Sequence, residues 1–475
     1  MARYTEIKAQ SPSKRRPRRL GQTHRMPQRT FTLGLLLLSL TVAAACASIG
    51  GPDATGVAGA IQERTGAVAR VAGTAAPEIP PGVSLTDGLT ADEAVAVALW
   101  NNAAFQVSVS ELGFARADLL DAGLLTNPVL SLLLPLGPKQ FEATLRWPAE
   151  VLWERPRRVA AAHRAADVVA QRLVQSGLDL VLGVRTAYAD LRLAIDRQRL
   201  AGDRAAVLER TETLMAARVA AGDIATLDAR PAQVDAASGR LEVDRVAQDV
   251  AVSRARLRLL AGLTEDGPAF ELAAASEADV ACAPPAARLR EALIARPDVR
   301  AAELAVEAAA ARLGWETSRI LTLSAVLDAN GQGRDGFEAG PGFDVSLPIF
   351  GRNQGGRARA TAELQRAAAA YVAIQQQVAA ELREALALSE QARRSVEAWR
   401  ARVLPPLETN LADAETQLAG GETSQLPVLE HRRRLIDAQV RAREFAADVE
   451  RARARVERAI GRSCPAVSEE TPRDR

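Results

Sequence analysis

Phe141-Glu-Ala-Thr-Leu-Arg-Trp-Pro148 alternates apolar and polar residues and then leads into a proline-free, helix-forming segment over residues 157–218. Phe343-Asp-Val-Ser-Leu-Pro348, in the second half of the chain, alternates in the same way and precedes a second helix-forming segment over residues 357–419. The two halves therefore repeat one unit, a short strand followed by a very long helix. Because an internal repeat decides the architecture before any local pattern does, this unit predicts a tall, mainly helical tube.

The first of these strands separates its side chains by chemistry. One face holds only apolar residues, namely Phe141, Ala143, Leu145 and Trp147. The other face holds Glu142, Thr144 and Arg146. A strand of this kind fits lipid on one side and water on the other. The alternative is a half-buried strand in a soluble sheet, although little else in the sequence supplies partner strands.

The helical segments are far longer than the core of a globular domain requires. Residues 157–218 as one helix would extend roughly 90 Å. The turn Gly222-Asp-Ile-Ala-Thr226 then returns the chain into a helix over residues 226–261. Apolar residues in this second helix fall mostly three, four or seven positions apart, which predicts a coiled-coil-like seam. They are Leu227, Val234, Leu241, Val246, Val250, Leu257 and Leu260.

These patterns divide the mature chain into two repeats. The first covers residues 85–262, with an opening helix, strands 129–134 and 141–147, a long helix 157–218 and a return helix 226–261. The second covers 289–461, with an opening helix, strands 321–329 and 343–347, a long helix 357–419 and a return helix 427–460. A linker at 263–288 joins them and a tail follows at 462–475. Pro405-Pro406 is expected to kink or break the second long helix.

The N-terminus reads as a targeting segment rather than as part of the fold. Residues 1–30 are basic, and Phe31 to Ala45 is an apolar run that ends at Cys46. This pattern is typical of a signal peptide over residues 1–45. Small residues before a lone cysteine resemble a bacterial lipoprotein signal, with Cys46 as the lipid attachment site and 46–84 as a linker. The alternative is an ordinary signal peptide, and translation starts at either Met1 or Met26.

Composition excludes several functional classes. The formal net charge is only +2, so nothing favours nucleic acid. No metal-ligand spacing links the three cysteines to histidine, and no cofactor motif is present. Phosphate loops, Gly-x-Ser-x-Gly and His-Glu-x-x-His are absent, which argues against an enzyme. Cys282 and Cys464 flank the second repeat, so they either form a disulfide or stay unpaired.

Four features together resemble the TolC-like outer membrane efflux protein family. Arg296-Pro-Asp-Val-Arg-Ala-Ala-Glu303 is similar to the helix that opens the family's second repeat. Leu347-Pro-Ile-Phe-Gly-Arg-Asn-Gln-Gly-Gly356 resembles its strand-to-helix segment, and the Arg-Asn-Gln-Gly part resembles the cobalt–zinc–cadmium efflux branch. Val403-Leu-Pro405 resembles the family's kinked helix. The remaining feature is a turn at each periplasmic tip, Gly222 to Thr226 and Gly421 with Ser424.

The resemblance implies a homotrimer in the outer membrane of a Gram-negative bacterium. Each protomer would give four strands to one composite β-barrel, and its long helices would build an α-helical barrel through the periplasm. Such a channel would conduct substrates delivered by a periplasmic adaptor and an inner membrane pump of the resistance–nodulation–division type. The rival interpretation is a periplasmic adaptor or a structural coiled-coil lipoprotein, which fits poorly because the chain has two long hairpins and few strands.

The resemblance also implies where the channel closes. Asp228 matches the acidic residue that follows the family's tip turn, whereas Pro427 takes that place in the second repeat and Glu430 is the next acid. Carboxylates around a narrow mouth would favour cations. Alternatively, both acids are ordinary surface charges in the first turns of helices. Metal ions and small organic molecules both remain open as cargo.

Overall fold

The computed structural model describes residues 50–71, 78–134, 141–264, 268–274, 288–331 and 336–463. The chain divides into two units, Met1–Gly50 and Gly51–Arg475, and every element below belongs to the second. Cys46, Cys282 and Cys464 lie outside the described residues. The predicted lipid attachment and the predicted disulfide therefore stay predictions.

Three helices of the described residues precede the first strand. They are α2 (Ala54–Thr65), α3 (Ala91–Asn101) and α4 (Ala103–Gly123). Helix α2 falls within the segment expected to be a linker. It forms because Asp53 caps it, accepting a hydrogen bond from the Gly56 N–H at 2.8 Å, and because Val57 and Ile61 are buried in the core.

The opening helix expected at the start of the first repeat is divided in two at Asn102. The backbone of Asn102 is extended there, with ψ at 117°. Its side chain accepts a hydrogen bond from the Phe105 N–H at 2.8 Å and donates one to the Leu260 carbonyl at 2.9 Å. Asn102 therefore starts α4 and ties the α3–α4 corner to the far end of the return helix.

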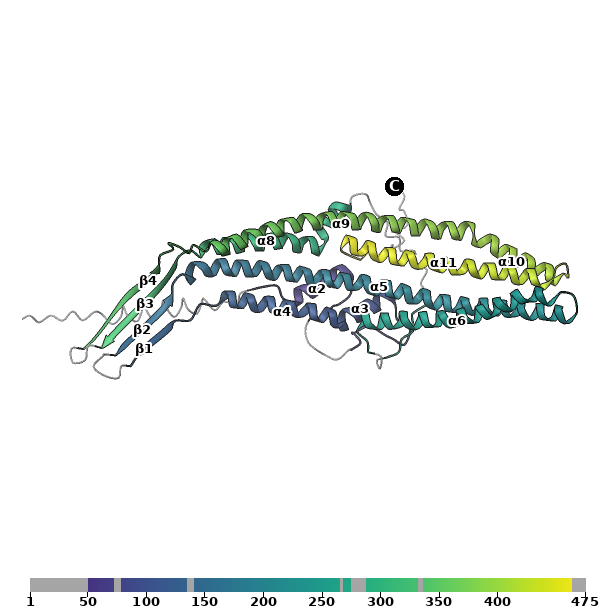
Figure 1. Ribbon diagram of the computed structural model, residues 1–475, viewed down its shortest axis with the longest axis horizontal. Helices are drawn as coiled ribbons and strands as arrows, with labels where there is room; N and C mark the ends of the chain where they lie inside the picture. The colour runs from purple at the N-terminus through teal and green to yellow at the C-terminus, as the bar shows by residue number, and fades with distance from the viewer. Residues whose placement is uncertain are drawn as a thin grey trace, which may run out of the picture. The chain divides into compact units, whose positions relative to one another are not determined.

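The four strands form one antiparallel sheet in the order β1-β2-β3-β4 (Figure 1). They are β1 (Val129–Leu133), β2 (Glu142–Pro148), β3 (Thr322–Gly331) and β4 (Phe337–Ser346). β2 and β3 come from different repeats and pair with Leu145 opposite Leu327. β4 begins earlier than the expected 343–347, because Gly340 and Gly342, which precede the expected strand, pair with β3.

The long helices run between the sheet and two turns. The first repeat supplies α5 (Val151–Ala220) and α6 (Thr226–Ala261). The second supplies α7 (Arg288–Ala295), α8 (Pro297–Ser318), α9 (Gln354–Arg402), α10 (Leu404–Ala419) and α11 (Gln425–Ile460). The expected helix 357–419 is thus α9 and α10, interrupted at Val403, two residues before Pro405.

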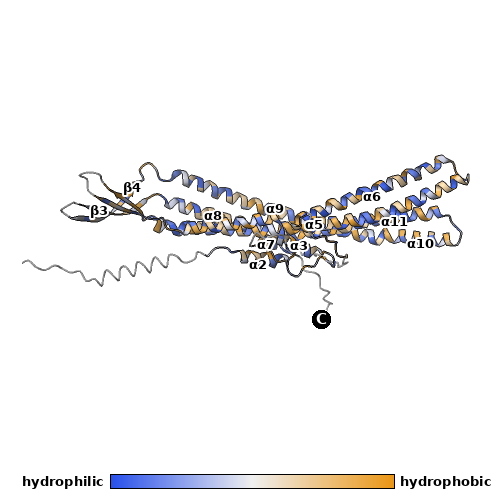
Figure 2. Cartoon of the chain, turned by 90° about the horizontal axis from the view of Figure 1, so that it is seen from below, coloured by the Kyte–Doolittle hydropathy of each residue, from blue (hydrophilic) through white to orange (hydrophobic). Residues whose placement is uncertain are grey.

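Helix α5 is the centre of the packing. It contacts α2, α3, α4, α6, α8 and α11. The largest apolar cluster lies where α2, α3 and α4 cover its middle, with Leu99, Val184 and Leu191 at its heart. A smaller cluster in the second repeat contains Val378, Leu382 and Val456. Among the described residues, no helix is both long and apolar enough to cross a bilayer. Figure 2 shows hydrophobic and hydrophilic residues interleaved along the long helices.

The coiled-coil-like seam expected on α6 is two separate faces rather than one. The inward face buries Val246 and Leu257 together with small residues such as Ala236 and Gly239. The other face leaves Leu227, Val234, Leu241, Val252 and Leu259 exposed. These five residues follow one another at spacings of seven, seven, eleven and seven, which return to nearly the same side of a helix. An apolar stripe therefore runs along the outside of α6 without a partner among the described residues.

Candidate functional site

The two turns that end the helical hairpins lie at the end of the bundle away from the sheet (Figure 1). α5 turns into α6 through Gly222, and α10 turns into α11 through Gly421. The neighbouring α5 and α11 pack there through an apolar cluster of Leu200, Val207, Leu429 and Ile436. The structure therefore brings the turns of both repeats together at one tip.

The two turns have the same backbone geometry. Gly222 and Gly421 are both left-handed, with φ of 78° and 74°. In each turn the glycine N–H donates to the carbonyl three residues back, at 3.0 and 3.1 Å respectively, and the next N–H donates to the carbonyl five residues back, at 2.9 Å. This is the Schellman pattern, which needs glycine because other residues are strained at positive φ.

The residues that follow the turns differ between the repeats. Thr226 opens α6, and the exposed carboxylate of Asp228 accepts a hydrogen bond from the Ala225 N–H at 3.3 Å. Ser424 is the N-cap of α11 but makes no side-chain cap hydrogen bond. Pro427 stands at the position that corresponds to Asp228, six residues after the turn glycine. The first turn is thus capped by a carboxylate and the second is not.

Glu430 does not occupy a position equivalent to Asp228. It lies nine residues after Gly421, whereas Asp228 lies six after Gly222, so it is about one helical turn further along its helix. Its exposed carboxylate lies 3.6 Å from Arg434, and Arg432 next to it pairs with Glu415 of α10 at 2.6 Å. The surroundings of Glu430 are therefore mixed in charge rather than purely acidic.

A ladder of ion pairs joins the two repeats along α5 and α11, and the sequence analysis did not find it. Arg204 lies 3.3 Å from Asp437, Asp190 lies 2.6 Å from Arg451 and Asp179 lies 2.9 Å from Arg458. Between these rungs, Arg197 pairs with Glu444 and Arg185 pairs with Glu457. The residue numbers of each pair sum to nearly the same value, as they do for two antiparallel helices in register. This regularity in the sequence could have predicted the pairs.

Arg296, quoted above for its motif, is the centre of a buried ionic cluster. Its side chain is fully buried, pairs with Asp298 and donates to Glu381 of α9 at 2.7 Å. Arg458 of the ladder binds the same Glu381. Burial alone would raise the pKa of Glu381, but hydrogen bonds from Gln377 and Arg296 and the charge of Arg458 hold it below its ordinary value. The motif therefore locks α8 to α9 and α11.

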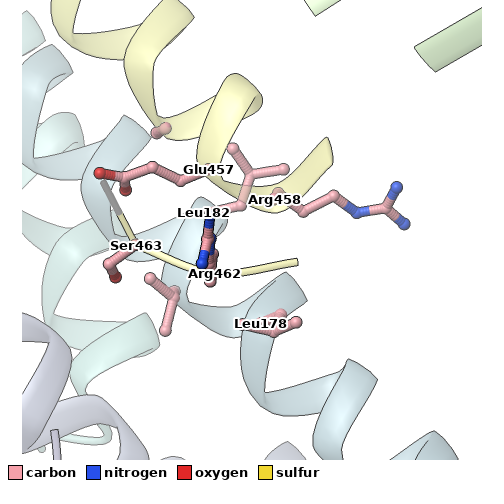
Figure 3. Close-up of a pocket in the computed structure, with 8 residues that line it drawn as sticks. Leu178, Leu182, Glu457, Arg458, Arg462 and Ser463 are labelled. Carbon is pink, nitrogen blue, oxygen red and sulfur yellow. The ribbon is translucent and has the colours of Figure 1, made fainter. Parts of the chain in front are cut away.

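The cavity beside this cluster is small and is lined by helix-packing residues. Figure 3 shows Leu178 and Leu182 of α5 facing the end of α11. Glu457, Arg458, Arg462 and Ser463 also line this cavity. Within the described ranges, no group of three or more His, Cys, Asp and Glu side chains has the geometry to hold a metal ion. Neither feature suggests a binding site for a small molecule.

The sheet separates polar from apolar residues on β2, β3 and β4. The register places Leu145, Leu327 and the exposed Phe343 and Val345 on one side. The other side carries all the charged residues of the described strands, which are Glu142, Arg146, Asp328, Glu338 and Asp344. Four acids and one base leave this face at a net charge of −3. Arg146 pairs with Asp344 at 2.8 Å, and Thr144 donates to Asp328 at 2.8 Å.

Comparisons with known proteins agree with this geometry. The family model described as outer membrane efflux protein matches residues 289–462. The cobalt–zinc–cadmium resistance protein CzcC of Cupriavidus metallidurans is 26% identical over 382 residues, covering 79% of this chain and 90% of CzcC.

Solved structures share the fold at lower identity. A structure of CusC is 20% identical and has a TM-score of 0.66, covering 79% of this chain and 93% of that one. The outer membrane channel MtrE of Neisseria gonorrhoeae is 18% identical and has a TM-score of 0.62, covering 84% of this chain and all of MtrE. The CmeC outer membrane channel of Campylobacter jejuni is 14% identical, with a TM-score of 0.65 and coverage of 80% and 87%.

Proposed function

Because this chain belongs to the outer membrane efflux protein family, we propose that it is the outer membrane duct of a tripartite efflux system. As a member of a channel family, the protein conducts rather than catalyses. It lies in the outer membrane of a Gram-negative bacterium and extends into the periplasm. The observation that carries the proposal is the sheet with one apolar and one charged face at one end of long helical hairpins.

Closure of this duct requires other copies of the chain. The sheet has two unpaired edges, β1 and β4, within the described residues, and open edges are not tolerated in hydrocarbon. The exposed stripe on α6 likewise needs a partner helix, because a long amphipathic helix is stable only when its apolar side is covered. A homotrimer meets both needs, with β1 of one copy pairing with β4 of the next in a composite barrel.

Lipid attachment at Cys46 fits the position of the first described residues. A side chain at Gly51 would meet Leu119, which lies in the last turns of α4 before the sheet. Cys46 lies five positions before Gly51 in the sequence. We propose that an acyl chain on Cys46 attaches the chain to the membrane a few residues before Gly51.

The tip is the proposed docking end for a periplasmic adaptor and an inner membrane pump of the resistance–nodulation–division type. Gly222, Thr226, Gly421 and Ser424 form the turns that would meet the adaptor, and Asp228 and Glu430 are the candidate gate residues. Asp228 is exposed in the first turn of α6, six residues after its glycine, and supports this role more strongly than Glu430, whose carboxylate lies beside Arg434.

Metal cations are the favoured cargo over small organic molecules. The relative CzcC is named for cobalt, zinc and cadmium resistance. The charged face of the sheet, which would line the barrel, carries a net charge of −3 in each copy and would attract cations. Survival on zinc, cobalt or cadmium salts and on a cationic dye, in cells with and without this chain and its own pump, would decide between the two classes.

The first experiment is the oligomeric mass of the purified protein in detergent, together with its single-channel conductance in a planar bilayer. We expect a trimer with a small conductance that rises in Asp228→Ala. Asp235→Ala, an exposed acid further along the same helix, is the matched control and should leave conductance unchanged. A monomer that never conducts would overturn the proposed function, whereas a conducting trimer insensitive to Asp228→Ala would overturn only the gate.

A further inference from the structure

The segment between β4 and α9 exposes an unusual amount of apolar surface. Phe350 is 91% exposed, the highest value for any large apolar side chain in the described part of the chain. Leu347 is 73% exposed and Ile349 is 64% exposed. Exposed apolar residues grouped in this way mark an interaction surface rather than ordinary surface.

This surface continues the apolar face of the sheet. Phe343 and Val345 lie on that face of β4, and Leu347 is the next residue of the same parity. Ile349 and Phe350 follow within one short turn, in which the Ile349 N–H donates to the Leu347 carbonyl at 2.8 Å. The apolar surface therefore extends past the end of the strand toward the first turn of α9.

The segment is held in place by its own hydrogen bonds. The Arg352 Nε donates to the Pro348 carbonyl at 3.1 Å, and the Gln354 Nε2 donates to the Phe350 carbonyl at 3.0 Å. Asn353 adopts a left-handed backbone, with φ of 54°, and its Nδ2 donates to the Glu316 carbonyl at 2.8 Å and to Glu316 Oε2 at 2.7 Å. These hydrogen bonds hold the segment against the end of α8, so Phe350 projects from an ordered segment.

Positive charge follows directly after the apolar residues. Arg352, Arg357 and Arg359 are exposed, and no Asp or Glu occurs between Leu347 and Ala362. Within the described ranges, none of the three arginines forms an ion pair. Apolar side chains followed by unpaired arginines, at the edge of a lipid-facing surface, are the arrangement found at membrane–water interfaces.

We propose that residues 347–359 form an interfacial anchor in the periplasmic leaflet of the outer membrane. Leu347, Ile349 and Phe350 enter the acyl region, and Arg352, Arg357 and Arg359 bind the phosphates of anionic headgroups. The anchor rests on the proposed lipid-facing side of the sheet and adds to it a recognition of anionic phospholipid. It would set the depth of the protein in the membrane where strand becomes helix.

A spin label at position 350 tests the apolar part. Phe350→Cys is made in a chain carrying Cys282→Ser and Cys464→Ser, reconstituted in bilayers. We expect accessibility to oxygen, which concentrates in lipid, to exceed accessibility to a water-soluble nickel chelate. Leu227→Cys, an exposed apolar position at the tip, is the matched control and should show the reverse. Two outcomes would contradict the proposed anchor. The label at position 350 could be more accessible to the nickel chelate than to oxygen, or a second copy of the chain could shield it from both reagents.

The arginine part has a separate test. The melting temperature of the detergent-solubilised protein is measured with added phosphatidylglycerol, phosphatidylcholine or inorganic phosphate. Only phosphatidylglycerol should raise it, and the combined Arg352→Gln, Arg357→Gln and Arg359→Gln variant should lose most of that rise. Arg230→Gln with Arg433→Gln, both at the tip, should keep it. Equal shifts in the triple variant and the wild type, or a shift with phosphate alone, would contradict headgroup binding. A trimer that conducts but fails these tests would leave the proposed function intact.

Discussion

Helices α5 and α9 occupy corresponding places in the two repeats, yet their surroundings are very different. α5 packs against six other helices and buries apolar residues along most of its length, including Leu173, Val184 and Leu200. α9 has 49 residues and buries only Ala360, Val378, Leu382, Ala385 and Ala392. Among the described residues, α2, α3 and α4 pack on α5, whereas α9 packs against α7, α8, α10 and α11.

The two repeats are therefore stabilised in different ways. The first repeat has a large apolar core of its own. The second has a small one and relies on the ionic cluster at Arg296 and on the ladder between α5 and α11. Much of α9 remains uncovered, which is expected if other copies of the chain complete its packing.

Removing the buried Arg296 should lower the stability of the second repeat more than the other substitutions described below. Arg296→Ala leaves Asp298 without its cation and Glu381 with Arg458 alone in a partly buried site, so we expect a loss of about 3 kcal/mol in the free energy of unfolding. Denaturant unfolding of the purified protein measures it. Arg300→Ala removes an exposed arginine from the same helix and should cost at most about 1 kcal/mol. Equal losses in the two variants would show that the cluster is not what holds the second repeat.

Replacing the turn glycines should affect both repeats alike. Gly421→Ala puts a side chain at φ of 74° and should cost roughly 1–2 kcal/mol. Gly420→Ala, one residue earlier at φ of −76°, should cost almost nothing. Gly222→Ala should match Gly421→Ala, because the two turns share their hydrogen bonds. Hydrogen exchange of the tip amides reports the change, and a different response of the two turns would contradict their equivalence.

Exchanging the first-turn residues should sharpen the difference between the tips. Asp228→Ala removes the acceptor for the Ala225 N–H and should destabilise the start of α6 by about 1 kcal/mol. Pro427→Asp places a carboxylate at the corresponding position of α11, where it can accept from the Ser424 N–H, and should protect that turn. Amide exchange at residues 222–228 and 421–427 measures both effects. Protection unchanged in both variants would mean that the carboxylate does not cap the helix.

Acid should loosen the ladder between the repeats, with the smallest effect because the ladder is partly exposed. Burial opposes ionisation of Glu444, but hydrogen bonds and charge from Arg197 and Arg441 hold its pKa below the ordinary 4.5. The stability from this pair is therefore present above the ordinary pKa and lost as the pH falls through the lowered folded value. Thermal melting between pH 7 and pH 3 tests this, with Glu444→Gln as the control. A wild-type profile that matches that of Glu444→Gln would show that this rung contributes nothing.

Local patterns in the sequence predicted most of the elements because those elements have local causes. α6 spans Thr226–Ala261 as expected, since Gly222 and Gly262 bound it and Pro231, close to its start, is accommodated within the helix. Pro405 and Pro406 end α9 because the proline ring and its missing N–H cannot continue a helix. Alternation in Phe141–Trp147 predicted a strand with one apolar and one polar face, and the register places these faces as expected.

The sequence by itself therefore determined the repeats, the turns and the faces of the strands, because each depends on residues within a few positions of one another. Only the tertiary structure decided which charges meet. Arg296 pairs with Glu381, which is 85 residues away in the sequence, and Arg451 pairs with Asp190, which is 261 residues away. It also decided that α2 folds within an apparent linker and that the apolar residues of α6 divide between core and surface. Side chains on a helix point in all directions, and only the packing of the neighbouring helices selects which of them become buried.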